Sequence, residues 1–222
     1  MPQGPMRFLF GGNFVLIPLP FTNFWDNSHM AKCVLFIDGE NFLHKIEEVL
    51  KQNALYKDKA RLSSIDINQL FKVPLKGFKI HRKLFYVAKL HLHKETLNKS
   101  EELIKFQRKL RNNLVNQDYE FIIAGNVRAQ KVDNKVVFRE KGVDVKIAVD
   151  MVSWACDKKL TTAILCSSDS DLQPAIKELR DRKVEVIYLG FENQPNKGLT
   201  FTANRTILLR NTEVLEIFKK RN

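Results

Sequence analysis

Cysteine is scarce in this chain, and its spacing excludes one common kind of metal site. The 222 residues include three cysteines, Cys33, Cys156 and Cys166, with no C-x-x-C pair among them. The number is odd, and all three lie in apolar segments that we expect to be strand or helix interior. This pattern argues against a structural zinc site and is typical of proteins kept in a reducing compartment.

The sequence also lacks a long uninterrupted hydrophobic run. Residues 8–21, FLFGGNFVLIPLPF, are apolar but are broken by glycines, Asn13, Pro18 and Pro20. The stretch is too short and too broken to cross a bilayer, and the polar TNFWDNS after it does not fit a signal-peptide cleavage region. We therefore expect no membrane association and, without a targeting signal, a cytoplasmic protein.

No linker rich in glycine, serine or proline divides the chain. Because 44% of the side chains are hydrophobic, the chain can bury one substantial core. We predict one main domain over residues 31–222. Residues 1–30 are expected to be an appendage outside that core, because Met30 directly precedes a clear strand pattern and is a candidate natural start.

The chain has fewer acidic residues than basic residues. The chain has 37 Lys and Arg residues against 25 Asp and Glu residues, a formal net charge of +12. Such an excess favours polyanionic partners such as nucleic acid or an acidic membrane surface. A generally basic soluble protein would show the same balance, so the charge alone does not identify the partner.

What the sequence does contain is a regular alternation of strand and helix patterns from Cys33 onward. Short apolar runs predict strands at residues 33–38, 83–90, 119–125, 161–168, 184–190 and 207–209. Amphipathic spacing predicts helices at residues 41–52, 63–72, 95–116, 142–157 and 171–182, a short helix after residue 190, and a last helix begun by Thr212. Residues 127–138 predict a hairpin that turns at Asp133 and Asn134.

Strands that are apolar on both faces and separated by amphipathic helices predict a parallel sheet covered on both sides. We therefore expect a three-layer α/β/α sandwich with a mainly parallel sheet and a small β-hairpin insertion. Two local details are also expected. The helix over 63–72 should begin at Ser63 or Ser64, and the helix over 142–157 should bury Val145, Ala148, Val149 and Val152.

Acidic side chains occur where the predicted strands end. Asp38 ends the first strand in the stretch FIDGEN, and Asp169 follows the strand over 161–168, with Asp171 opening the next helix. Asp144 lies in the first turn of a helix that must begin at the same edge of the sheet. Because parallel α/β sheets bind ligands at the carboxyl ends of their strands, we expect these four acids to lie close together.

Clustered carboxylates have an energetic consequence. Two carboxylates about 5 Å apart repel each other by about 3 kcal/mol at an effective dielectric constant of about 20. Either some of the acids are protonated or a cation lies among them. A ligand set made only of oxygen atoms favours Mg²⁺ or Mn²⁺, and such an ion at a basic surface suits phosphodiester hydrolysis.

Ordinary helix capping would explain each acid taken singly. Asp38 could cap the helix that follows it, Ser168 and Asp171 have capping-box spacing, and Asp144 could oppose a helix dipole. Independent capping gives no reason for these helix ends to share one edge, so the joint pattern favours a site. Asp150 lies on another helix face than Asp144 and is expected to contact solvent or a neighbouring helix.

Three segments resemble the NYN domain, in the LabA-like branch of the PIN-like nucleases. They are Asp38 to Asn41 as D-x-x-N, EKGVDVKIAVDM at 140–151, and CSSDSDLQPAIKELRDRKVEVIYLG at 166–190. The resemblance covers roughly residues 31–209. It implies a PIN-like sandwich and a metal-dependent ribonuclease, with Asp38, Asp144 and Asp169 matching the metal-site acids and Asp171 a further acidic position.

The same resemblance places Asn41 where it could hydrogen-bond a phosphate or a metal-bound water. Ser168 stands where many relatives carry glycine, so the loop backbone there is expected to lie less close to a ligand, with Ser168 itself as a substrate contact. Some members of this broad family bind RNA or act as scaffolds without robust cleavage. A non-catalytic RNA-binding or scaffold protein of the same fold is therefore the main alternative, and a homodimer is left open.

Basic residues follow the predicted hairpin toward Asp144, with Phe138 among them. They are Arg128, Lys131, Lys135, Arg139 and Lys141. Phosphate contacts together with a stacked base would suit single-stranded RNA, and Lys141 is the best single phosphate-binding candidate. A solvated hairpin with ordinary charge alternation would look similar.

Two other enzyme classes fit less well. A phosphatase of the haloacid-dehalogenase type would need a second aspartate two residues after Asp38, where Glu40 stands. A dinucleotide-binding fold would need a glycine-rich first turn, and D-G-E-N does not match G-x-G-x-x-G. A nuclease or an RNA-binding protein of the same fold therefore remains.

Overall fold

The computed structural model describes residues 8–10, 13–15, 33–56, 58–92, 96–132 and 135–219, with the side chains of residues 8–15 and 128–140 outside the description. The chain divides into two units, Met1–Met30 and Ala31–Asn222. In the first unit, β1 (Phe8–Phe10) pairs antiparallel with β2 (Asn13–Val15). The expectation that residues 1–30 are an appendage stays a prediction.

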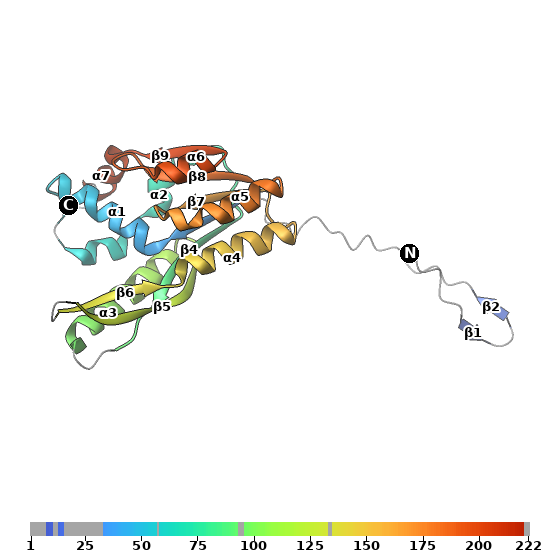
Figure 1. Ribbon diagram of the computed structural model, residues 1–222, viewed down its shortest axis with the longest axis horizontal. Helices are drawn as coiled ribbons and strands as arrows, with labels where there is room; N and C mark the ends of the chain where they lie inside the picture. Colours follow the sequence, from blue (N-terminus) through green and yellow to red (C-terminus); the bar gives the residue numbers. More distant parts are fainter. Residues whose placement is uncertain are drawn as a thin grey trace. The chain divides into compact units, whose positions relative to one another are not determined.

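The second unit is built on a seven-stranded sheet in the order β6-β5-β4-β3-β7-β8-β9 (Figure 1). Its strands are β3 (Cys33–Asp38), β4 (Arg82–Lys89), β5 (Glu120–Val132), β6 (Lys135–Lys141), β7 (Thr162–Cys166), β8 (Glu185–Phe191) and β9 (Arg205–Leu209). All neighbours are parallel except β5 and β6, which form the predicted hairpin. The strand expected at 119–125 continues into this hairpin as one long strand, and the turn at 133–134 lies outside the described residues.

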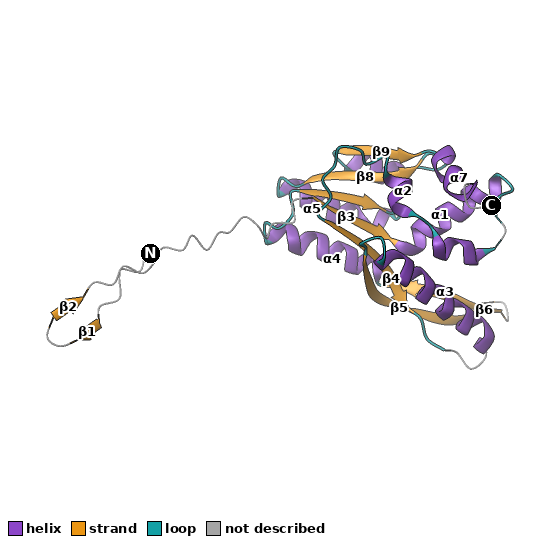
Figure 2. Cartoon of the chain, turned by 180° about the vertical axis from the view of Figure 1, so that it is seen from behind, coloured by secondary structure: helices purple, strands orange, loops and turns teal. Residues whose placement is uncertain are grey.

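Helices cover both faces of the sheet, which confirms the predicted three layers (Figures 1 and 2). One face carries α1 (Gly39–Gln52), α2 (Ile67–Phe71), α3 (Leu97–Val115) and α7 (Asn211–Lys219). The other carries α4 (Val143–Cys156), α5 (Gln173–Asp181) and α6 (Lys197–Thr202). Because side chains alternate along a strand, Leu35 and Ile37 of β3 join the first core while Val34 and Phe36 join the second. None of the helices in the described residues is long and apolar enough to span a bilayer.

The helix expected from Ser63 or Ser64 begins elsewhere. A 3-10 helix, η2 (Lys59–Ser64), precedes α2, whose N-cap is Asp66. The Asp66 carboxylate accepts a hydrogen bond from the backbone N–H of Gln69, whereas the Ser63 hydroxyl donates to the Ala60 carbonyl at 2.6 Å. The serine therefore satisfies a carbonyl in the preceding turn, and the aspartate takes the capping position.

The inner face of α4 also differs from the expectation. Val145 and Val149 are 59% and 51% exposed, and Ala148 and Val152 are only partly buried. The buried side chains are Val143, Ile147, Met151 and Ala155, which follow one another at intervals of four residues. Because α4 is apolar over most of its circumference, its sequence is compatible with more than one buried face.

The sheet winds in both directions from β3, which pairs with β4 on one side and β7 on the other. The ends of these strands therefore frame the crevice at which parallel α/β sheets bind ligands. Gly39 allows α1 to start directly against β4, because a Cβ at this position would lie 2.5 Å from the Tyr86 carbonyl oxygen. Asp38, the last residue of β3, is thereby fixed at the edge of the crevice.

Candidate active site

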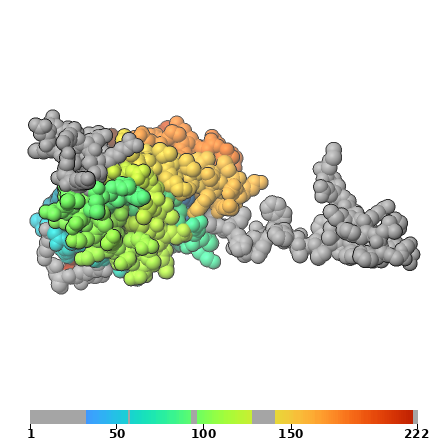
Figure 3. Space-filling model, turned by 90° about the horizontal axis from the view of Figure 1, so that it is seen from below, coloured from blue at the N-terminus to red at the C-terminus, as the bar shows by residue number. Residues whose placement is uncertain are grey.

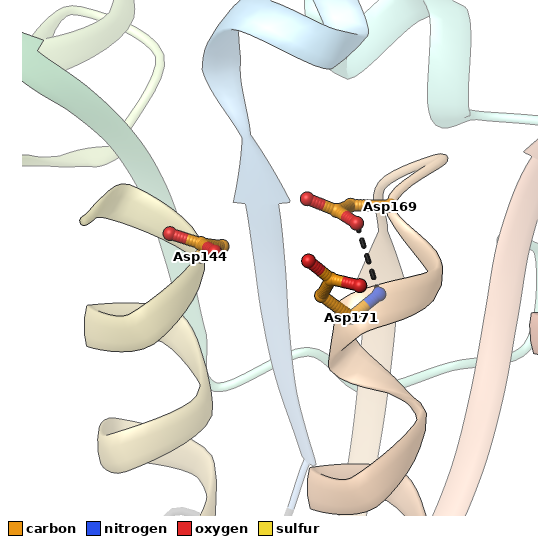
Figure 4. A group of neighbouring side chains, drawn as sticks. All are labelled: Asp144, Asp169 and Asp171. Carbon is orange, nitrogen blue, oxygen red and sulfur yellow. Dashed lines mark hydrogen bonds between the residues drawn. The ribbon is translucent and has the colours of Figure 1, made fainter. Parts of the chain in front are cut away.

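Three acidic side chains from two separate parts of the chain meet at this edge of the sheet. Asp144 lies in the first turn of α4, while Asp169 and Asp171 lie in the segment that joins β7 to α5. Carboxylate oxygens of the three residues all lie within 4.8 Å of one another. Figure 4 shows Asp144 on α4 across from Asp169 and Asp171. The sequence-based expectation that these three acids approach one another is matched by the geometry.

Asp38 lines the same cleft as Asp144 and Asp169 but is not part of the group of three. Its side chain is turned inward, and the residue is 4% exposed. One carboxylate oxygen accepts from the Asn41 backbone N–H at 3.2 Å, and the other accepts from Asn41 Nδ2 at 2.7 Å and from the Ser167 hydroxyl at 3.0 Å. The capping interpretation of Asp38 is therefore correct, and it coexists with a position in the cleft wall.

The environment of Asp38 acts on its ionisation in two directions. Burial raises the pKa of the carboxyl group above its ordinary value, and the negative charge of Asp169 adds to this rise. The hydrogen bonds from Asn41 and Ser167 favour the ionised form and oppose the rise without cancelling it. A positive charge bound in the cleft would favour the ionised form further.

Ser168 holds Asn41 rather than lining the cleft. Its hydroxyl donates to Asn41 Oδ1, and its backbone carbonyl accepts from Asn196 Nδ2 at 2.9 Å. The predicted role of Ser168 in substrate binding stays a prediction, since the contact found for its side chain is with Asn41. Asn41 itself lines the cleft.

Asp169, not Ser168, caps the short 3-10 helix η4 (Ser170–Leu172) before α5. Asp169 Oδ1 accepts from the Asp171 backbone N–H at 2.9 Å. The Asp169 backbone N–H in turn donates to the Ser167 hydroxyl oxygen at 3.1 Å. The capping-box interpretation of Ser168 and Asp171 is therefore wrong, because Asp169 occupies the N-cap position and accepts the hydrogen bond from the Asp171 backbone N–H.

Two glycines bring the start of α4 to the cleft. Gly142, the N-cap of α4, has φ +91°, and Gly125 of β5 has φ +67°, so both are in the left-handed region that favours glycine. A Cβ at Gly125 would lie 2.2 Å from the Lys141 carbonyl oxygen. This close crossing of β5 and the end of β6 places both Lys141 and Asp144 in the cleft wall.

The cleft has a volume of about 520 Å³ and contains five of the predicted site residues. They are Asp38, Asn41, Lys141, Asp144 and Asp169. Glu40 and His44 also line it and were not predicted. They lie four residues apart on α1, on the side opposite the buried Phe42 and Ile46, so helical spacing could have identified them.

The remaining basic residues of the predicted substrate track lie on the hairpin. Arg128 and Lys131 belong to β5, and Lys135 and Arg139 belong to β6, with Arg128 directly opposite Arg139. Their side chains lie outside the described part of the structure. The RNA track along this hairpin stays a prediction.

Asp150 lies outside the acidic group, as expected, but its partner across the core is strand β4 and not a neighbouring helix. Its Oδ2 accepts from the Tyr86 hydroxyl at 3.0 Å, and its Oδ1 lies 2.6 Å from Lys146 Nζ. Tyr86 is fully buried in the core between α4 and the sheet. Asp150 therefore ties α4 to β4 and is not a member of the acidic group.

The donor atoms of the acidic group suit a hard divalent cation. Within the described residues, the group of three contains carboxylates alone, without histidine or cysteine. Carboxylate oxygens are the ligands that Mg²⁺ and Mn²⁺ prefer, whereas zinc is more often held by nitrogen and sulfur. The cleft is wide enough to leave room for water and a phosphate beside such an ion.

Comparisons with known proteins agree with this architecture. The structure is similar to the crystal structure of a protein of unknown function from Vibrio parahaemolyticus, with a TM-score of 0.54 and 19% sequence identity over 82% of this chain and 94% of that chain. At this identity the likeness concerns the fold alone. No curated protein gave a significant match. Residues 32–210 match the NYN domain, most of the chain, and the protein therefore belongs to the NYN domain family.

Proposed function

We propose that this protein is a Mg²⁺- or Mn²⁺-dependent ribonuclease that hydrolyses phosphodiester bonds of single-stranded or flexible RNA. Membership of the NYN family indicates a PIN-like nuclease fold. The observation that carries the proposal is the group of three carboxylates within 4.8 Å at the carboxyl edge of the sheet. The sequence pattern further suggests the LabA-like branch of the family.

The roles of the residues follow from their positions. Asp144, Asp169 and Asp171 would hold the cation, with Asp38 as a further acid in the cleft wall. A bound ion would activate water and neutralise charge that develops on the phosphate. Asp38 orients Asn41 through two hydrogen bonds, and the Asn41 amide would contact the phosphate or a water beside it.

Lysine and arginine side chains would bind the phosphates of the RNA backbone. Lys141 is exposed and lines the cleft, where it would contact the phosphate next to the cleaved bond. Arg128, Lys131, Lys135 and Arg139 would continue this contact along the hairpin. The net charge of +12 supports a polyanionic substrate. A cytoplasmic location remains part of the proposal, and the homodimer stays open.

The test is cleavage of labelled single-stranded RNA with and without Mn²⁺, by the wild type and by Asp38→Asn and Asp169→Asn variants. We expect metal-dependent cleavage by the wild type and loss of most of this cleavage in both variants. Asp157→Asn is the matched control, because Asp157 is an exposed aspartate just after α4 that pairs with Lys159. Equal breakdown by the wild type and the Asp169→Asn variant would assign the activity to a contaminant.

The second candidate is a non-catalytic RNA-binding or scaffold protein. The large positive charge and the basic hairpin favour RNA binding irrespective of cleavage. Tight binding of RNA with no metal-dependent loss of substrate would select this function. The same labelled RNA serves both measurements.

A further inference from the structure

An apolar pocket adjoins the acidic cleft and is not used by the proposed chemistry. It has a volume of about 430 Å³ and lies between α1, the end of β4, α3 and β5. Figure 3 shows the surface of α3 and β5, in green, beside α4, in yellow. The walls of the pocket include Leu43, Val87, Leu103, Phe106 and Leu110.

The pocket and the cleft share part of their lining. Glu40 and His44, one turn apart on α1, line both. His44 Nδ1 lies 3.5 Å from Glu48 Oε1 in the next turn of the helix. A molecule bound with its phosphate in the cleft can therefore extend past these two side chains into the pocket without leaving the protein surface.

The chemistry of the pocket suits a flat aromatic group with polar edges attached to an anion. Its volume lies within the range of about 300–1,000 Å³ that is typical of small-molecule sites. Lys59 Nζ lies 5.5 Å from the centre of the Phe106 ring, so an aromatic wall and a positive charge occur together. Gln107 adds an amide to the lining, and its Nε2 is held by the Ala88 carbonyl at 2.9 Å.

We propose that this pocket binds one unstacked nucleobase of the RNA, from the nucleotide next to the cleaved phosphate. The inference rests on the proposed function, because the phosphate of that nucleotide must lie in the acidic cleft. Single-stranded RNA is commonly recognised through bases that leave the stack and enter such pockets. A fatty acyl chain would account for the apolar walls but not for the connection to the acidic cleft or for the cation beside Phe106.

The test fills the pocket while leaving the acids in place. Leu103 is half-buried in the pocket wall, and Leu103→Trp should occupy its space. Val115→Trp is the matched control, because Val115 is a 50% exposed residue of the same helix that does not line the pocket. Both variants and the wild type are compared on an RNA oligonucleotide and on the same oligonucleotide with one abasic nucleotide at the 5′ or 3′ side of the mapped cleavage position.

We expect Leu103→Trp to lower kcat/KM on intact RNA by at least about tenfold, the size of effect that follows loss of one stacked base. Its rate on one of the two abasic oligonucleotides should equal that of the wild type, since no base enters the pocket there. Val115→Trp should match the wild type on every substrate. Unfolding curves of both variants report whether either fails to fold.

A direct measurement on the wild type does not depend on any variant. RNA with a single 4-thiouridine next to the cleavage position should photocrosslink to peptides that contain Leu43, Leu103 or Phe106. Crosslinks exclusively elsewhere, or full RNA cleavage by Leu103→Trp, would overturn the pocket assignment while leaving the nuclease proposal intact. Absence of metal-dependent cleavage by the wild type would overturn the nuclease proposal and this inference with it.

Discussion

The Ser168 hydroxyl donates a hydrogen bond to Asn41 Oδ1, although the two residues are 127 positions apart in the chain. A second bond, from the Ser167 hydroxyl to Asp38 Oδ2 at 3.0 Å, runs beside it. Together they join the start of α1 to the loop after β7. The acids on these two segments are therefore held in a fixed relation by neutral side chains.

The first prediction concerns this link. Ser168→Ala should lower the free energy of unfolding by about 1 kcal/mol, because Asn41 loses a partly buried hydrogen bond. A double-mutant cycle with Asn41→Ala, followed by denaturant unfolding, should give a coupling energy of about 0.5–1.5 kcal/mol. Ser153→Ala, at an exposed position of α4, is the control. Additive effects of Ser168→Ala and Asn41→Ala would contradict the link.

The second prediction concerns cation binding. Mn²⁺ at a hundred times its dissociation constant should stabilise the wild type by about 2.7 kcal/mol and raise Tm by about 5–10 °C. Asp144→Asn and Asp171→Asn should each remove most of this rise, because the group of three loses a ligand. Thermal unfolding with added Mn²⁺, and then with EDTA, measures the effect. An undiminished rise in both variants would place the cation elsewhere, and Asp157→Asn again serves as the control.

The third prediction separates the two aspartates of α4. Tyr86→Phe should lower the free energy of unfolding by about 1–2 kcal/mol, because Asp150 loses its hydrogen bond from a fully buried hydroxyl. RNA cleavage and the stabilisation by Mn²⁺ should stay unchanged in this variant. Loss of the Mn²⁺ effect on replacing Tyr86 would show that the core behind α4 controls the acidic group.

The fourth prediction concerns the hairpin. Replacing Arg128, Lys131 and Lys135 together with Ala should weaken RNA binding and flatten its dependence on salt. Each phosphate contact to a single strand contributes about 0.7 to the slope of log K against log salt, so the slope should fall by up to about 2. Fluorescence anisotropy over a range of KCl concentrations measures it, with Lys72→Ala, at an exposed position after α2, as the control. An unchanged slope would exclude this track.

The fifth prediction concerns the cysteines. Cys156 is exposed, whereas Cys33 and Cys166 are buried. Burial raises the pKa of both buried thiols, to about 11 for Cys33, where the charge of Glu185 adds to the effect. At pH 8, iodoacetamide should therefore modify one cysteine of the native protein, Cys156, and all three after unfolding. Rapid native modification of Cys33 would contradict the described burial.

The raised pKa of Cys33 also predicts how the stability of the folded protein changes at alkaline pH. The unfolded Cys33 thiol ionises near its ordinary value of 9.0, and the folded thiol ionises near 11. Between these values the unfolded state releases its proton first, so the folded state loses stability as pH rises above 9, by less than about 3 kcal/mol from this residue. Cys33→Ala should flatten the fall in Tm between pH 9 and pH 11 relative to the wild type.

Much of the fold follows from local patterns in the sequence. The strands at β3, β4, β7 and β8 are short and strongly apolar, and the buried face of α1 has an unambiguous helical period. The order of these elements then requires a parallel sheet with helices on both faces. The mutual approach of Asp144, Asp169 and Asp171 follows from the same topology, because parallel strands end at one edge.

The side-chain orientations that the sequence did not predict have a common physical cause. Val145 and Val149 were expected inside α4, but neighbouring Ile147 and Met151 offer an equally apolar face that fits the sheet better. The capping bond of Asp38 with Asn41 is local, but the inward turn of Asp38 also depends on a hydrogen bond from Ser167, 129 positions along the chain, which no local pattern reveals. Side-chain choices that depend on distant partners are settled by tertiary packing.

Asp38 caps a helix and Asp144 does not, and this difference decides which of them should be replaced to make an inactive protein. The Asp38 carboxylate caps α1, so a change there alters the start of a helix as well as the cleft. Asp144 follows a glycine cap, Gly142, which has no side chain that could form a capping bond. Asp144→Asn is therefore the better choice for capturing uncut RNA from cells, since the bait would keep its native shape while losing a charge.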